Sequence, residues 1–317
     1  MKGIPLLIIA HRRPHYLESV LKSVCKASPS RIYVSVDGAR QEVEGEKELV
    51  SACHGMVSRL QATSKIEVFT RFNDSNLGSA ANIIKSIDWF FESEHSGLIL
   101  EEDCLPDSSI TNYMRFNLDR FELEKRVWIV SGYRPEIDGL TTEPCFAHIP
   151  MNWGWGTWAS KWTEIRKGIL ESTRDEPILK LPFSSTRNVF WTIGAKRALN
   201  GWVDAWDIPL AHAMLKFDKL AYLPPKNLVS NIGTDQFALN TSHKSIFLES
   251  KTYCWKNVGN PEDSCFFQET LINRDDSLIE DQMIQIKWTH RFLPIIKYVL
   301  QKILKKNDYR GRLSQRV

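Results

Sequence analysis

Leu98-Ile99-Leu100-Glu101-Glu102-Asp103 joins a short apolar run directly to three carboxylates. The run has the length of a buried strand. Adjacent carboxylates at the end of such a strand repel one another and lose hydration, so a partner of opposite charge is expected. Oxygen ligands suit Mg²⁺ or Mn²⁺. Strand alternation places Glu101 and Asp103 on one face and Glu102 on the other. A solvated acidic turn before a helix, with Asp107 as its N-cap, is the alternative.

Similar apolar runs lie on both sides of this stretch, at residues 4–10, 32–36, 66–69 and 127–130. Segments with helical periodicity separate them, with apolar faces such as Leu17, Val20, Leu21 and Val24, or Leu49, Cys53, Met56, Val57 and Leu60. This alternation predicts an α/β fold with a mostly parallel sheet flanked by helices. Ligands bind beyond the carboxyl ends of such strands. The residues that follow the runs are therefore the first candidates for a site: His11, Arg12, Asp37, Arg71, Glu101, Glu102 and Asp103.

Length and composition narrow the class of protein. The chain has 317 residues, 43% hydrophobic and 25% charged, with a net charge of +3. These values exclude disorder, a multispanning membrane protein and a strongly basic nucleic-acid binder. The length predicts a ligand-binding half at 1–135, an elaborated second half at 136–285 and a separate tail at 286–317. Six cysteines without a C-x-x-C pair, and a short first apolar run without a cleavage site, predict a cytoplasmic protein.

Two further segments are candidates for ligand contact. Asn76-Leu77-Gly78-Ser79-Ala80-Ala81-Asn82 opens a helix with small residues that let a ligand approach the backbone, although an ordinary helix start is equally compatible. It lacks the glycine patterns of dinucleotide and P-loop sites. In Trp153-Gly154-Trp155-Gly156-Thr157-Trp158, the indoles could bind sugar faces beside Gly156. The spacing of Trp155, Trp158 and Trp162 is also that of a core helix face, so we expect only Trp155 to lie near a ligand.

Asp207 is the candidate general base. It follows Trp206, and apolar surroundings raise the pKa of a carboxyl group toward a value useful for proton transfer. The alternative is a helix N-cap before Ile208-Pro209. His243 is a candidate contact for a metal or a phosphate, although a single histidine is more often structural.

The tail at 286–317 is basic and amphipathic. From residue 287 onward nine Lys or Arg accompany one acid, and Phe292, Ile295, Ile296, Val299, Leu300, Ile303 and Leu304 form a helical apolar stripe. This pattern fits peripheral binding to an anionic membrane, at the inner face of the plasma membrane. It fits equally well a helix packed on its own domain.

Taken together, these segments resemble a nucleotide-sugar glycosyltransferase of the GT-A fold, which is Rossmann-like. They are similar to the N-acetylglucosaminyltransferase I family and to related bacterial nucleotide-diphospho-sugar transferases. The matching segments are 4–10, 34–37, 100–107, 127–132, 153–158, 205–207 and 225–233, followed by Ser242-His243. Two departures stand out: Glu-Glu-Asp replaces Glu-Asp-Asp at 101–103, and the segment 233–243 is less acidic than in relatives.

The resemblance implies a residue-by-residue site. Asp37 would contact a uridine, Asp103 would bind Mn²⁺ or Mg²⁺ together with His243, and Asp207 would be the catalytic base. The other donor-binding residues would be His11, Arg12, Arg71, Asn76, Gly78, Asn82, Glu101 and Glu102. Those that contact the acceptor or the sugar would be Trp155, Gly156 and Trp206.

The implied function is inverting transfer of a sugar from a UDP-sugar to a hydroxyl of a glycan or glycolipid, in bacterial surface polysaccharide synthesis. Two alternative functions each explain part of the sequence. A sugar nucleotidyltransferase would need a glycine-rich loop after the first strand, where this chain has His11-Arg12-Arg13-Pro14. A non-catalytic sugar-binding module would explain the tryptophans but not the carboxylates at 101–103.

Overall fold

The computed structural model describes residues 3–135, 143–171 and 185–233 of the chain. His243 and the predicted basic tail at 286–317 lie outside these residues, as does all of 234–285. The described strands are β1 (Leu6–Ala10), β2 (Arg31–Val36), β3 (Glu67–Phe72), β4 (Ser96–Glu101), β5 (Cys104–Pro106), β6 (Val127–Ser131), β7 (Cys145–Ala147), β8 (Trp155–Trp158), β9 (Leu220–Leu223) and β10 (Val229–Asn231). The described helices are α1 (Pro14–Ala27), α2 (Glu46–Thr63), α3 (Ser79–Phe91), α4 (Ile110–Phe121), α5 (Ala159–Glu171), α6 (Ser185–Leu199) and α7 (Asp207–Lys216).

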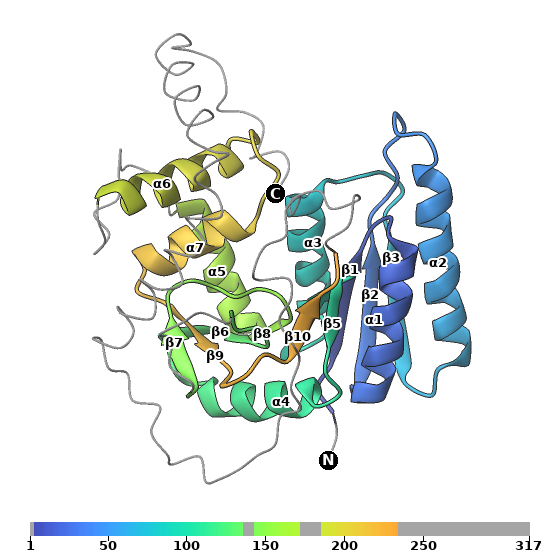
Figure 1. Ribbon diagram of the computed structural model, residues 1–317, viewed down its shortest axis with the longest axis horizontal. Coiled ribbons are helices and arrows are strands. Elements are labelled where there is room, and N and C mark those ends of the chain that lie inside the picture. The colour runs from blue at the N-terminus through green and yellow to red at the C-terminus, as the bar shows by residue number, and fades with distance from the viewer. Residues whose placement is uncertain (1–2, 136–142, 172–184, 234–317) are drawn as a thin grey trace.

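Eight of these strands form one mixed sheet in the order β3-β2-β1-β4-β8-β6-β9-β7. β1 pairs in parallel with β2 and β4, and β2 with β3. β8 is antiparallel to both β4 and β6, so β4 and β6 run the same way. β9 is parallel to β6, and β7 is antiparallel to β9. The predicted α/β fold with a mostly parallel sheet flanked by helices is therefore confirmed (Figure 1).

The two faces of the sheet are covered by different helices, because alternate strand residues point to opposite faces. Leu6 and Ile8 of β1 belong to a core shared with α1, α2 and α4. Leu7 and Ile9 belong to a second core shared with α3, α5 and α7. Strands buried on both faces read as continuous apolar runs, which explains why the sequence revealed them so clearly. Figure 1 shows α1 and α2 beside the first strands and α5, α6 and α7 beside the later ones.

Two details of the predicted pattern are wrong. The helical periodicity predicts Leu49 on the apolar face of its helix, but Leu49 is 40% exposed, and Val50 is the residue that packs inward. The alternation expected for residues 101–103 also fails, because β4 ends at Glu101 and the chain turns there. Glu102 and Asp103 consequently both face Arg13.

A small second sheet brings the later chain to the acidic turn. β10 pairs antiparallel with β5, which follows the turn directly. Beyond β10, the backbone N–H of Ile232 donates to the carbonyl of Asp103 at 2.8 Å. The segment that ends at Gly233 thus lies against the carboxylates.

Within the described residues, no helix is both long enough and apolar enough to cross a membrane.

Candidate active site

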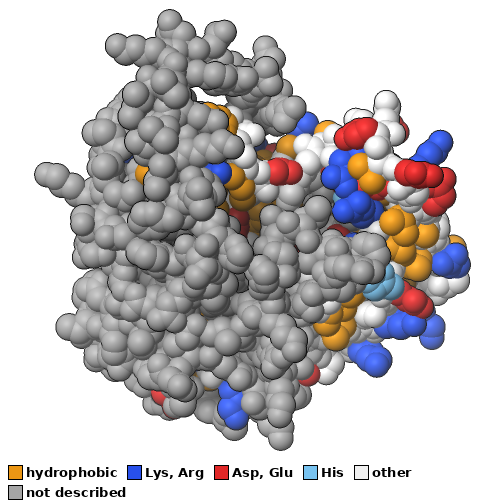
Figure 2. All heavy atoms as spheres, turned by 45° about the horizontal axis from the view of Figure 1, so that its top comes forward, with side chains coloured by type: hydrophobic (Ala, Val, Ile, Leu, Met, Phe, Trp, Pro, Cys, Tyr) orange, Lys and Arg blue, Asp and Glu red, His pale blue; other side chains and the backbone are white. Residues whose placement is uncertain are grey.

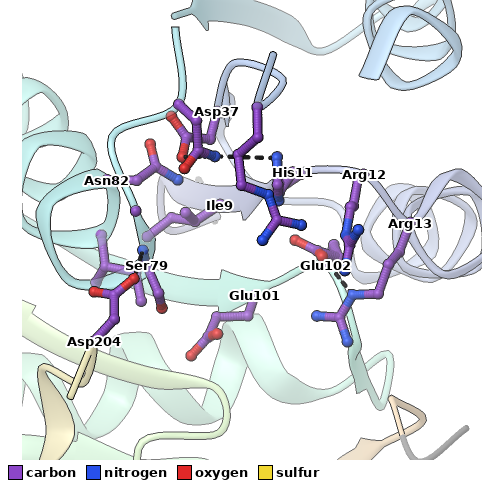
Figure 3. Close-up of a pocket in the computed structure, with 15 residues that line it drawn as sticks. Ile9, His11, Arg12, Arg13, Asp37, Ser79, Asn82, Glu101, Glu102 and Asp204 are labelled. Carbon is purple, nitrogen blue, oxygen red and sulfur yellow. Dashed lines mark hydrogen bonds and ion pairs between the residues drawn. The ribbon is translucent and has the colours of Figure 1, made fainter. Parts of the chain in front are cut away.

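A pocket lies at the carboxyl ends of β1, β2 and β4, where a parallel sheet is expected to bind ligands. Eight of the residues predicted to bind the donor line it: His11, Arg12, Asp37, Asn76, Gly78, Asn82, Glu101 and Glu102. Figure 3 shows side chains from β1, β4, α3 and the chain before α7 converging on this space. In Figure 2, which brings the top of Figure 1 forward, basic and acidic side chains lie side by side.

Arg13 is the counter-ion of the acidic turn. Its Nε donates to Glu102 Oε1 at 2.6 Å, and its Nη2 lies 2.9 Å from Asp103 Oδ2. Burial lowers the pKa of Arg13, but the charges of Glu102 and Asp103 outweigh this effect and raise the pKa overall. The cation expected beside the carboxylates is therefore, at least in part, a guanidinium of the chain itself.

Glu101 is the third carboxyl group of the acidic turn, and its surroundings favour the neutral, protonated form. Burial, and to a smaller extent the charges of Asp103, Glu102 and Asp207, raise its pKa to about 8. Arg13 acts in the opposite direction. The site thus brings the Asp207 carboxylate from the later chain close enough to β4 to repel Glu101.

Asp207 is the first residue of α7, and Trp206 is the N-cap. The N-cap alternative for Asp207 is therefore wrong, because Trp206 occupies the N-cap position and Asp207 lies inside the first turn. Its carboxylate lies at the positive end of the helix dipole. Half-buried and beside the pocket, it is in a suitable place to accept a proton.

Asp37 is 2% exposed and anchors the loop before α3. Its Oδ1 accepts hydrogen bonds from Asn73 Nδ2 at 3.0 Å and from the backbone N–H of Leu77 at 3.1 Å. Its Oδ2 accepts one from Asn76 Nδ2 at 2.9 Å. Because a carboxylate offers about four lone-pair sites, these protein donors use most of its capacity. Its contact with a uridine stays a prediction.

A buried glutamate holds the basic rim of the pocket. Glu46 Oε2 lies 2.8 Å from Arg12 Nη1 and 2.6 Å from Arg40 Nη2, and His11 Nε2 lies 3.1 Å from Oε1. Burial raises the pKa of Glu46, but hydrogen bonds from Arg40 and the charge of His11 bring it down to about 2. Glu46 is thus ionised, and it fixes guanidinium groups that suit a phosphate.

The start of α3 is occupied by a carboxylate from the other half of the chain. Asp204 accepts hydrogen bonds from the backbone N–H groups of Ser79 at 2.6 Å and Ala80 at 2.9 Å. Gly78 makes this approach possible, since its φ is +84° and an added Cβ would lie 2.9 Å from Asp204 Oδ2. Small residues therefore do permit close approach here, and the group that approaches in this structure is Asp204.

The tryptophan segment is core. Trp155 is 1% exposed and stacks on Trp206, with ring centroids 5.5 Å apart. The expectation that only Trp158 and Trp162 are buried is corrected, since all three indoles are enclosed. Gly156 faces the packed interior of the sheet, where a Cβ would meet Leu118 at 3.0 Å. These positions serve packing in the described structure and offer no open surface to a sugar.

Arg71 does not line the pocket. It lies on β3, and its Nη1 is buried without a hydrogen-bond partner among the described residues. Asp103 lies next to the pocket rather than in its lining, paired with Arg13.

Four polar residues that line the pocket were not among the predicted site residues: Arg13, Arg40, Ser79 and Asp204. Arg13 directly follows two selected residues, so its place after the first strand was a usable signal. No local sequence signal marked Asp204, because its hydrogen-bond partners lie more than a hundred residues earlier in the chain.

Fold and site define an α/β protein with a charged pocket at the carboxyl edge of its sheet. No protein-family model matches the chain, and no curated protein matches it. Among solved structures, HddC from Yersinia pseudotuberculosis matches with a TM-score of 0.31 and 10% identity, over 50% of this chain and 77% of that one. HddC complexed with GMP-PN matches with a TM-score of 0.31 and 11% identity, over 55% of this chain and 80% of that one. The glycosyltransferase GlyE of Streptococcus pneumoniae matches with a TM-score of 0.33 and 15% identity, over 56% of this chain and 40% of that one. At such TM-scores these likenesses carry no argument, and the resemblance to the N-acetylglucosaminyltransferase I family stays a prediction.

Proposed function

We propose that this chain is an inverting glycosyltransferase that moves a sugar from a UDP-sugar to a hydroxyl of a glycan or glycolipid. The observation that carries the proposal is the pocket at the carboxyl ends of β1, β2 and β4, which Glu101 lines together with three arginines, while Asp207 at the start of α7 lies near enough for its charge to act on Glu101. Arg12, Arg13 and Arg40 beside them supply donors for a diphosphate. A role in bacterial surface polysaccharide synthesis, with a lipid-linked acceptor at the membrane, belongs to the same proposal.

In the proposed reaction, Asp207 takes the proton of the acceptor hydroxyl as its oxygen bonds to the anomeric carbon. The bond from that carbon to the diphosphate oxygen breaks, and UDP leaves with the electron pair. One displacement inverts the anomeric centre. The guanidinium groups of Arg12 and Arg40, fixed by Glu46, would orient the diphosphate.

The acidic turn fits a divalent cation in part. Within 3–135, 143–171 and 185–233, no three ligand-type side chains gather closely enough to hold a metal by themselves. The neighbouring carboxylate charges that help to raise the pKa of Glu101 nevertheless favour a cation there, and Mg²⁺ is usually held by one or two carboxylates plus substrate phosphates. Asp103 would be the protein ligand, with His243 as a predicted second one. When bound, Mn²⁺ or Mg²⁺ would neutralise charge on the departing diphosphate.

A nucleotidyltransferase is less compatible with this arrangement. β1 ends at Ala10 and α1 begins at Pro14, so no glycine-rich loop fits between them.

Thermal unfolding with UDP tests the donor and metal assignments. Because a ligand that binds only the folded state raises the midpoint, UDP should stabilise wild type more with Mn²⁺ than without it. We expect Asp103→Ala to lose the part of this rise in midpoint that depends on Mn²⁺. Glu122→Ala is the matched control, since Glu122 pairs with His95 at the amino end of β4, opposite the carboxyl end where the pocket lies. An Mn²⁺-dependent shift that survives in Asp103→Ala would remove Asp103 from the metal site.

Asp207→Asn tests catalysis separately from binding. Loss of a general base lowers turnover by about 10²- to 10⁴-fold. The variant should still be stabilised by UDP and Mn²⁺ as wild type is. Its sugar-transfer activity, measured as the release of UDP, should be lost. Full transfer activity in Asp207→Asn would exclude this residue as the base, and intact binding with no turnover in wild type would favour a sugar-binding module.

A further inference from the structure

Asp204 is a pocket carboxylate that neither the acidic turn nor the proposed base accounts for. It lies on the connection between α6 and α7, three residues before Asp207. Two backbone N–H groups of α3 fix its orientation, at 2.6 and 2.9 Å. The absence of a side chain at Gly78 leaves the space that Asp204 occupies. Its direction is thus set before any ligand arrives.

Part of the acceptor capacity of Asp204 is unused. Each oxygen accepts one backbone hydrogen bond, whereas a carboxylate offers about four lone-pair sites. Within the described ranges, no Lys, Arg or His side chain pairs with it. Asp204 also lines the pocket, so a ligand there can reach the remaining sites.

The charges that line the pocket are separated. Figure 3 shows Asp204 on one side of the pocket and Arg12 and Arg13 on the other, with Glu101 between them. A diphosphate fits the guanidinium groups, because charge-assisted bonds to phosphate are strong. The carboxylate of Asp204, on the other side, instead favours a neutral group rich in hydroxyl donors and disfavours a second anion.

We propose that Asp204 accepts hydrogen bonds from hydroxyl groups of the transferred sugar, and that it selects neutral sugars over sugars that carry a carboxylate. This inference rests on the proposed function, since it needs a nucleotide-sugar donor in the pocket. It assigns Asp204 to specificity rather than to proton transfer. Asp207 keeps the role of base.

Dissociation constants for UDP, UDP-glucose, UDP-galactose, UDP-N-acetylglucosamine and UDP-glucuronate, all with Mn²⁺, test the inference. Wild type should bind its best neutral UDP-sugar more tightly than UDP-glucuronate. Because a hydrogen bond to a charged group is lost, Asp204→Asn should bind that neutral sugar about tenfold more weakly. Binding of UDP alone should change by less than about twofold, and discrimination against UDP-glucuronate should shrink.

Two further variants separate specificity from folding. Asp204→Ser keeps a neutral oxygen that can accept from the start of α3, as serine does at N-caps, and should show the same selective loss. Glu122→Gln removes a carboxylate near the amino end of β4, opposite the carboxyl end where the pocket lies. It should bind every nucleotide as wild type does.

The outcomes are distinguishable. Equal weakening of UDP and UDP-sugar in both Asp204 variants would make Asp204 a structural residue only and overturn the inference. So would variants that bind the neutral sugar as wild type does, or a wild type that prefers UDP-glucuronate. If wild type binds none of the five compounds, the proposed function itself falls.

Discussion

Arg13 shows how much one residue decides at this site. Two carboxylates that follow a buried strand would be unstable alone, and the guanidinium bonds to both of them. Its side chain is itself only 17% exposed, so the cluster is mostly removed from water. Removing one partner of a buried ion pair costs more than the pair contributes, because the remaining charge keeps its desolvation penalty.

We therefore expect Arg13→Ala to lower the free energy of unfolding by about 3–5 kcal/mol. Urea unfolding at neutral pH measures this change. Adding Glu102→Gln should restore part of the loss, since one of the two unpaired charges is then gone. Lys22→Ala breaks an exposed pair on α1 and serves as the control, for which no measurable change is expected. Equal losses in the single and double variants would contradict the assignment of Arg13 as counter-ion.

At the scale of elements, the sequence predicted what periodicity determines and missed what turns determine. The five apolar runs of the first half are all strands, and four of them read as continuous apolar stretches because they are buried on both faces, whereas β3 buries only Val68. Alternation beyond Glu101 failed because the strand ends there. The spacing of the tryptophans suggested one helical face, yet Trp155 and Trp158 belong to β8 and only Trp162 to α5. The contact of Asp204 with α3 depends on tertiary folding alone, so no local pattern could predict it.

The start of α3 provides a prediction at this scale. Gly78 has φ +84° and ψ 161°, a conformation open almost only to glycine, so Gly78→Ala should lower the free energy of unfolding by about 1–3 kcal/mol. The new methyl group would also displace Asp204, so UDP-sugar binding should weaken beyond the effect on UDP. Gly45→Ala is the matched control, because Gly45 also has positive φ but a Cβ there would meet nothing within 4 Å. It should lose stability and keep its nucleotide preference. A Gly78→Ala protein with the wild-type preference would argue against a role for the Asp204 contact in binding.

At the scale of the whole molecule, α7 links the site to the second core. Asp207 starts this helix beside the pocket, and the next residues, from Ile208 to Leu215, are all buried. Among them His212 is 0% exposed, and neither ring nitrogen has a hydrogen-bond partner among the described residues. Burial lowers the pKa of His212 to about 4, with smaller contributions from the charges of Lys216 and Lys196. The protein thus keeps a neutral imidazole inside the core that supports its proposed base.

This burial predicts a pH dependence of global stability. In the unfolded chain His212 titrates near its ordinary pKa of 6.5, whereas the folded protein binds that proton only near pH 4. As the pH falls from 6.5 toward 4, the unfolded state therefore gains a proton that the folded state refuses, and stability decreases. A pKa difference of this size corresponds to a loss of about 3 kcal/mol, complete near pH 4 and absent above about pH 7. Urea unfolding between pH 4 and 8 measures it. His212→Leu should remove this part of the pH dependence, while His15→Gln, at an exposed position, should retain it. Equal slopes in wild type and His212→Leu would mean that other groups control the acid sensitivity of the fold.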